Sequence, residues 1–164
     1  MATPTYEAIA TNTLVSPSAT VTFSSIAADW TDLVIVQTFP NNEIYGYTTF
    51  RYNGDTSSNY SLTTVYGYST ATSGREANVT FIRLGTSSYM SNSNTITHIQ
   101  NYSNTTTYKT SISRYNFGQT NGSPKDVGAT VGMWRETDAI SSIELSISSG
   151  TYAAGSTFTL YGVL

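Results

Sequence analysis

Residues 156–164, with the sequence STFTLYGVL, alternate small polar residues with apolar ones. Phe158 and Leu160 fall on one face of such a segment, and Gly162 or Leu164 continues that face. A period of two is that of a β-strand with one buried face. Because the same texture recurs along the rest of the chain, we expect an all-β fold.

The composition favours strands over helices. Charged residues make up only 10% of the 164 residues, against about 25% in an average globular protein. Threonine and serine take their place as the solvating residues, and there are 13 tyrosines. Threonine and tyrosine favour strands, and the 38% of hydrophobic residues is enough to build a core.

Several classes of protein are disfavoured by the same data. The net charge is −3 without any basic run, so we expect no nucleic-acid partner. No apolar stretch is long enough to span a membrane as a helix, and the first residues do not resemble a secretory signal. The absence of cysteine excludes disulfides and thiolate metal sites.

Turn signals such as Asn53-Gly54 and Asn121-Gly122 separate the expected strands. We expect loops at 71–75 and 85–93, where small and polar residues dominate. The expected strands cover residues 6–15, 19–23, 32–39, 47–52, 60–68, 78–84, 95–102, 107–117, 127–135, 140–147 and 156–164.

Short strands at even spacing, without a helix, indicate an antiparallel β-sandwich. We predict a jelly-roll-like sandwich of about 8–11 strands rather than an immunoglobulin-like one, because the chain is long and lacks a Cys–Trp–Cys core. We expect a single domain over residues 1–164, with residues 1–6 as an extended N-terminal arm.

No catalytic or metal-binding set is evident. His98 is the single histidine, so a Ser-His-Asp triad would have to use it, but its place in a strand fits a polar sheet residue better. The carboxylates sit mostly at strand ends and turns, which disfavours a glycosidase pair. Residues 53–55 with Asn59, and Glu136 with Asp138, could offer oxygens to Ca²⁺, although turn chemistry explains both. We therefore expect no enzyme, no metal and no cofactor.

The tyrosines are the better candidates for a binding role, because tyrosine suits protein interfaces and sugar stacking. The alternative is that they are core residues or cross-strand pairs. The tyrosines concerned lie within 24 residues: Tyr45, Tyr47, Tyr52, Tyr60, Tyr66 and Tyr68.

The chain resembles a group of small all-β virion proteins of tailed bacteriophages. The matching stretches are YEAIATNTL (6–14), ATVTFSSI (19–26), WTDL (30–33), FRYNGD (50–55), NYS (59–61) and GSTFTLYG (155–162). These motifs are structural, so the resemblance implies a non-enzymatic β-sandwich built into the particle, and it carries over no site residues.

From the resemblance and the composition we expect a capsid decoration (cement) protein that stabilises the shell and acts in the virion after assembly in the host cytoplasm. Its expected partners are further copies of itself, as a homotrimer, and the major capsid protein. The alternative is a tail-fibre domain that recognises host glycans. The expected partner-binding residues are Thr3, Pro4, Tyr6, Tyr45, Tyr47, Tyr66 and Tyr68.

Overall fold

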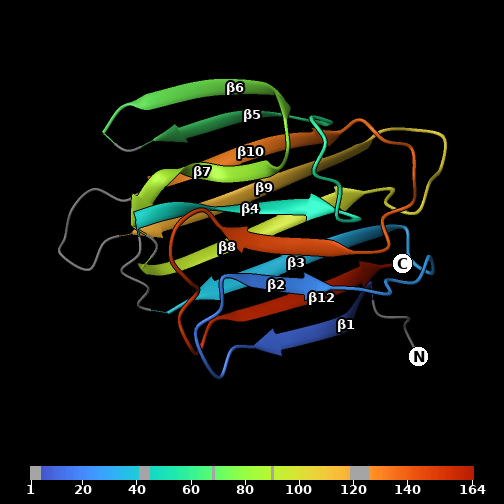
Figure 1. The fold of residues 1–164 in the computed structure, drawn as a ribbon, viewed down its shortest axis with the longest axis horizontal. Helices are drawn as coiled ribbons and strands as arrows, with labels where there is room; N and C mark the ends of the chain where they lie inside the picture. The colour runs from blue at the N-terminus through green and yellow to red at the C-terminus, as the bar shows by residue number, and fades with distance from the viewer. Residues whose placement is uncertain (1–4, 41–44, 68, 90, 119–125) are drawn as a thin grey trace.

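The computed structural model describes residues 5–40, 45–67, 69–89, 91–118 and 126–164. This part of the chain is entirely β, and its strands form two antiparallel sheets that pack as a sandwich (Figure 1). The expected all-β sandwich is therefore confirmed.

The strands follow the chain with short connections. Their bounds are β1 Tyr6–Thr13, β2 Thr20–Phe23, β3 Asp32–Phe39, β4 Tyr45–Tyr52, β5 Tyr60–Gly67, β6 Ala71–Val79, β7 Ile82–Tyr89, β8 Ser91–Gln100, β9 Lys109–Gly118, β10 Asp126–Trp134, β11 Ile143–Ile147 and β12 Thr157–Val163.

The two sheets differ in size. The large sheet has eight strands in the order β1-β12-β3-β8-β9-β10-β5-β6, and the small one has four in the order β2-β11-β4-β7. Figure 1 shows the small sheet lying over the middle of the large one, with β1 and β6 at opposite edges. Without the antiparallel pairs β5–β6 and β9–β10, two four-stranded sheets would remain, β1-β12-β3-β8 and β2-β11-β4-β7.

Aromatic side chains fill the space between the sheets. At one end Phe39 stacks on Tyr152 with 5.3 Å between ring centroids, and both rings contact Phe158. At the other end Trp134 lies against Tyr60 and Tyr52, at 6.3 and 5.5 Å. Each of these rings is buried, so the strands that carry them cannot turn over without exposing an aromatic side chain.

Between these aromatic groups, the inner face of the large sheet carries a row of buried hydroxyls. The oxygens of Thr97 and Ser113 lie 2.8 Å apart, and those of Thr64 and Thr130 lie 3.1 Å apart. All four side chains are almost completely buried. A buried hydroxyl is tolerated when it has a hydrogen-bond partner, so the pairs allow polar strands to line the core.

Two expectations about loops are wrong. Residues 71–75 begin β6, residues 85–89 end β7 and residues 91–93 begin β8. β6 is an edge strand with no buried side chain, so it shows no apolar alternation. In β8 the inward positions start with Ser91 and Ser93, which are buried although polar. The described residues form twelve strands, one more than the upper end of the expected 8–11.

The expected turn at Asn53-Gly54 is confirmed. Both residues have positive φ, 52° and 66°, and the amide of Asp55 donates to the carbonyl of Tyr52 at 2.9 Å. Tyr6 is already the first residue of β1, whereas residues 1–4 of the expected arm lie outside the described part. The single-domain interpretation stays a prediction.

The strand expected from the last residues is also confirmed as β12. Phe158, Leu160 and Gly162 are buried on one face, and Trp30 lies directly on Gly162. A Cβ added at Gly162 would stand 2.2 Å from the Trp30 ring, closer than real contacts allow.

We predict that Gly162→Ala lowers the free energy of unfolding by about 1–3 kcal/mol, because the ring of Trp30 must move off the sheet. Gly74→Ala in β6 is the matched control, because a Cβ there meets nothing within 4 Å. Urea unfolding followed by tryptophan fluorescence measures both variants. Equal stability of the two variants would show that the close contact between Gly162 and Trp30 does not contribute to the free energy of unfolding.

Candidate functional site

The side of the large sheet that faces away from the small sheet, which we call the outer face, carries exposed aliphatic side chains over its middle. It comprises the outward side chains of β3, β8, β9, β10 and β5. The register aligns Val34, His98, Ile112 and Val131 in one row across the strands. The next row is formed by Val36, Ile96, Arg114, Ala129 and Val65.

The aliphatic side chains of this surface are well exposed. Ile112 is 54% exposed and Val131 is 50% exposed, while Val65 and Val127 reach 55% and 62%. On the same strands the inward row consists of the hydroxyls of Thr97, Ser113, Thr130 and Thr64. The usual arrangement, apolar inside and polar outside, is thus reversed over the middle of four strands. A surface of this kind marks an interaction site.

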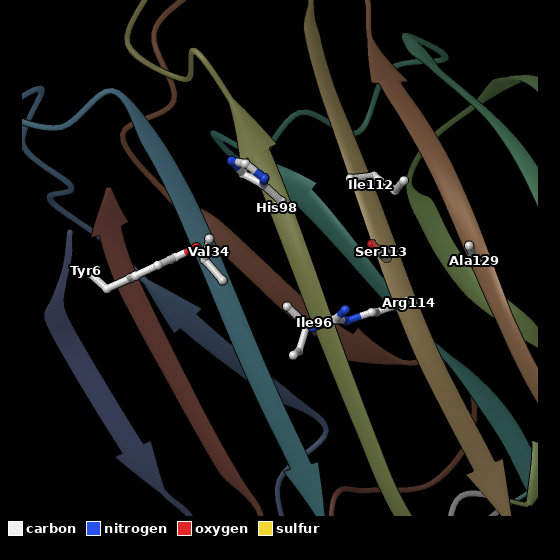
Figure 2. A pocket seen from close by; sticks show the side chains of 8 residues that line it. All are labelled: Tyr6, Val34, Ile96, His98, Ile112, Ser113, Arg114 and Ala129. Atoms are coloured by element: carbon white, nitrogen blue, oxygen red, sulfur yellow. The ribbon is translucent and has the colours of Figure 1, made fainter. Parts of the chain in front are cut away.

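Tyr6 borders a hollow in the outer face. Its side chain extends from β1 across β12 to Val34, as Figure 2 shows. The hollow has a volume of about 320 Å³, and its floor is formed mainly by Val34, Ile96, Ile112 and Ala129. An open depression lined by aliphatic groups suits an inserted side chain of another molecule more than a polar substrate.

Arg114 is the cation of this surface. It extends from β9 toward Ile96 on β8 (Figure 2). No hydrogen bond or ion pair joins it to any residue in the described ranges. An arginine lying on aliphatic neighbours with a free guanidinium is a frequent centre of protein interfaces.

His98 lies on the same face and has a carboxylate partner, but no serine or threonine hydroxyl of the described residues is hydrogen-bonded to it. Its Nε2 lies 2.8 Å from Oδ2 of Asp32, whose Oδ1 accepts from the amide of Asn101 at 2.7 Å. Ser113, which borders the same hollow, is buried and bonded to Thr97. The contact between His98 and Asp32 therefore orients the end of β8. This agrees with the interpretation of His98 as a polar sheet residue.

The tyrosines singled out in the sequence do not gather at one site. Tyr6 lies on the outer face, whereas Tyr47 lies beneath Arg83 on the small sheet, 5.7 Å from the guanidinium carbon to the ring centroid. Tyr66 is partly buried against the core. Tyr45 pairs with Tyr89 in β4 and β7.

The remaining expected contact residues, Thr3, Pro4 and Tyr68, lie outside the described residues. Among the expected contact residues that the structure places, only Tyr6 thus lies on the outer face.

Tyr47 belongs to a row of aromatic and cationic groups on the small sheet. Its ring lies 6.3 Å from that of Phe81, and Arg51 stands 5.5 Å over the Phe81 ring. Both arginines are also held by carboxylates: Arg51 pairs with Glu144 at 3.2 Å, and Arg83 pairs with Glu76. This row is the second candidate surface.

The two segments considered for Ca²⁺ meet in the structure, but as a hydrogen-bond network. Asn59 donates to Asp55 at 3.1 Å and to Glu136 at 2.8 Å. Asp55 also accepts from the indole N–H of Trp134 at 2.7 Å and from the amide of Ser57 at 2.8 Å. Both carboxylate oxygens of Asp55 are thereby occupied by donors. Within the described ranges, no group of acidic and histidine side chains could hold a metal ion.

Lys109 is a buried cation that sequence reasoning missed. Its Nζ donates to the carbonyl oxygens of Asn104, Thr107 and Thr137 at 2.5–3.0 Å. Burial lowers its pKa, and nearby Asp138 opposes that shift. The ammonium thus ties the turn before β9 to the segment after β10. The one feature of the sequence that could have indicated the buried cation is a lysine at an inward position of a strand.

Comparisons with known proteins add little. No family model matches the chain, and no curated protein matches it. A solved structure with partial likeness is described as a putative pore-forming toxin from Bacteroides vulgatus, at 9% identity and a TM-score of 0.12. The alignment covers 91% of this chain and 61% of that one, so the chain spans about three fifths of its length. A TM-score this low does not establish a shared fold. No helix of the described chain is long and apolar enough to cross a membrane.

We predict that Asp55→Asn destabilises the fold by about 1–3 kcal/mol, since a carboxylate that accepts several N–H groups is replaced by an amide. Burial raises the pKa of Asp55, but hydrogen bonds from Trp134, Ser57 and Asn59 outweigh it and hold the pKa below its usual range. The carboxylate therefore stabilises the protein above the unfolded-state value of 3.8, and this contribution is lost as pH falls through the folded-state pKa.

Urea unfolding at pH 7 and at stepwise lower pH tests this. The difference between wild type and Asp55→Asn should shrink in acid. Asp29→Asn, at an exposed position, should match wild type throughout. A constant difference at every pH would disprove the role of the charge.

Proposed function

We propose that this chain is a non-enzymatic structural protein of a bacteriophage particle, a decoration protein that binds the capsid shell and stabilises it. The observation that carries the proposal is the exposed apolar outer face. Covering the half-exposed side chains of this face would stabilise a complex by on the order of 1 kcal/mol for each of Ile112, Val131, Val65 and Val127. A free monomer lacks this stabilisation, and an assembled protein has it.

The strand order supports the same proposal. We interpret the sheets β1-β12-β3-β8 and β2-β11-β4-β7, in which the first strand pairs with the last, as the framework of a jelly roll. The pairs β5–β6 and β9–β10 would then be insertions that widen one sheet. Jelly rolls are frequent in viral capsid and lectin domains. The inserted strands supply Val65, Ile112, Val127 and Val131, so the insertions are what build the outer face.

The polar groups favour a structural role over catalysis. Asp55 and Glu136 accept hydrogen bonds from Asn59, and Glu76 and Glu144 are paired with arginines. Groups already committed to structural donors are poor candidates for acid–base chemistry, which needs a free group at the substrate.

A second candidate function is recognition of host glycans by a tail-fibre domain. The observation in its favour is the row of Tyr47, Phe81 and two arginines on the small sheet. Aromatic rings can stack on sugars while arginines bind hydroxyl or carboxylate groups. A glycan array probed with wild type and Tyr47→Ala tests it, and a signal that the substitution removes would favour this function over the first.

We predict that the purified protein binds empty shells of the phage whose genome carries the sequence, and that saturating amounts raise the thermal midpoint of the shell by linkage. Cosedimentation measures binding, and calorimetry with and without the protein measures the midpoint. Shells that neither bind the protein nor change their midpoint would refute the decoration role.

A further inference from the structure

We propose that the outer face binds a different protein, one that places a carboxylate, surrounded by apolar side chains, against Arg114. This rests on the proposed function, because the partner is taken to be the shell protein. It adds the surface, the anchor residue and the chemistry of the partner.

The size of the face is the first argument. Five strands of about eight residues, spaced by about 4.8 Å with a rise of about 3.3 Å per residue, cover about 600 Å², and all eight strands cover about 1,000 Å². A standard protein interface buries about 800 Å² on each partner. The five strands of the outer face therefore supply about three quarters of one side of a standard interface, and the neighbouring strands β12 and β1 of the same sheet can supply the rest.

Arg114 sets the chemistry of the partner. Its neighbours in the register are Ile96 on one side and Ala129 on the other, so a protein that covers the aliphatic groups must also cover the guanidinium. Burying a charge without a partner costs several kcal/mol. A planar guanidinium is matched by a carboxylate, which can accept two parallel hydrogen bonds. The partner must therefore bring an acidic side chain to this point.

A second copy of this chain that presents the same face does not satisfy that requirement. Asp32 supplies the one outward carboxylate on the five strands of the outer face within the described ranges. It lies two strands and four residues away from Arg114, about 16 Å by strand geometry. A two-fold pair that joined Arg114 to Asp32 would need its axis near His98, halfway between them. Val65 and Val127, on the far side of Arg114, would then remain uncovered.

A two-fold axis through the centre of the aliphatic groups would cover those groups but would leave Arg114 without a carboxylate. It would cover Ile112 and Val131, but it would place Arg114 of each copy against apolar side chains or against its equivalent. Two unpaired charges would then be buried, and the cost would offset much of the apolar gain. Charge complementarity thus argues against a two-fold pair of outer faces, and we take a different protein, the shell protein, as the occupant.

Binding to empty shells of the same phage tests the inference, with four variants of the full chain. Arg114→Glu reverses the anchor, and Val131→Asp places a charge in the apolar surface. Val15→Asp is the matched control, because Val15 is 94% exposed in the turn after β1. Arg75→Glu makes the same charge change as Arg114→Glu on the edge strand β6, on the same side of the sheet but outside the five strands. Unchanged circular dichroism and thermal midpoints establish that each variant is folded.

We expect Arg114→Glu and Val131→Asp to bind at least about 30-fold more weakly than wild type, as hot-spot residues do, and the controls to bind like wild type. Wild-type binding that neither face variant weakens would overturn the inference and leave the decoration role standing. Absence of wild-type binding overturns both. If sedimentation instead shows a dimer that Val131→Asp dissociates, the occupant is a second copy and the inference is wrong.

Discussion

The arrangement of the large sheet depends on paired hydroxyls buried between the two layers. Thr97 with Ser113, and Thr64 with Thr130, are hydrogen-bonded in a space from which water is excluded. A buried hydroxyl costs less free energy when it is paired, so one contact favours the observed register of β8 with β9 and the other that of β5 with β10. The same register sends the alternate residues of those strands, which are aliphatic, to the outer face. The apolar surface is thus a consequence of a polar interior.

Large side chains decide which of the two faces turns inward. Tyr115 and Phe117 on β9, Trp134 on β10, and Tyr60 with Leu62 on β5 all point into the core. A change of one residue in register would bury the aliphatic groups of the outer face, but it would expose these larger rings. Burial of an aromatic ring removes more apolar area from water than burial of a valine does. The aromatic residues near the strand ends therefore outweigh the aliphatic ones in the middle.

This balance explains what the sequence could and could not predict. The strands with a strong apolar pattern are predicted closely: residues 32–39 form a continuous apolar run, and residues 156–164 alternate. β6 was missed because both of its faces are exposed, and the start of β8 was missed because its buried residues are serines. The outer face could not be located because strands such as β9 carry apolar residues on both sides. The approach of Asp55 to Glu136 needs the pairing of Tyr60 with Trp134, which no local pattern encodes.

The edges of the large sheet indicate that its face, more than its margins, is the surface open to assembly. β1 carries a bulge between Ala8 and Ala10, and such a bulge interrupts the regular ladder that an added strand would need. β6 carries Arg75 and Glu76 beside Gly74, and charged or flexible residues at an edge discourage pairing with another chain. On the outer face, Arg114 is a charged side chain without a partner in the described residues, whereas Asp32 is paired with His98. Under the proposed function, the residue that would limit aggregation would also be the one that confers selectivity, because an unpaired charge among apolar groups favours a partner that neutralises it.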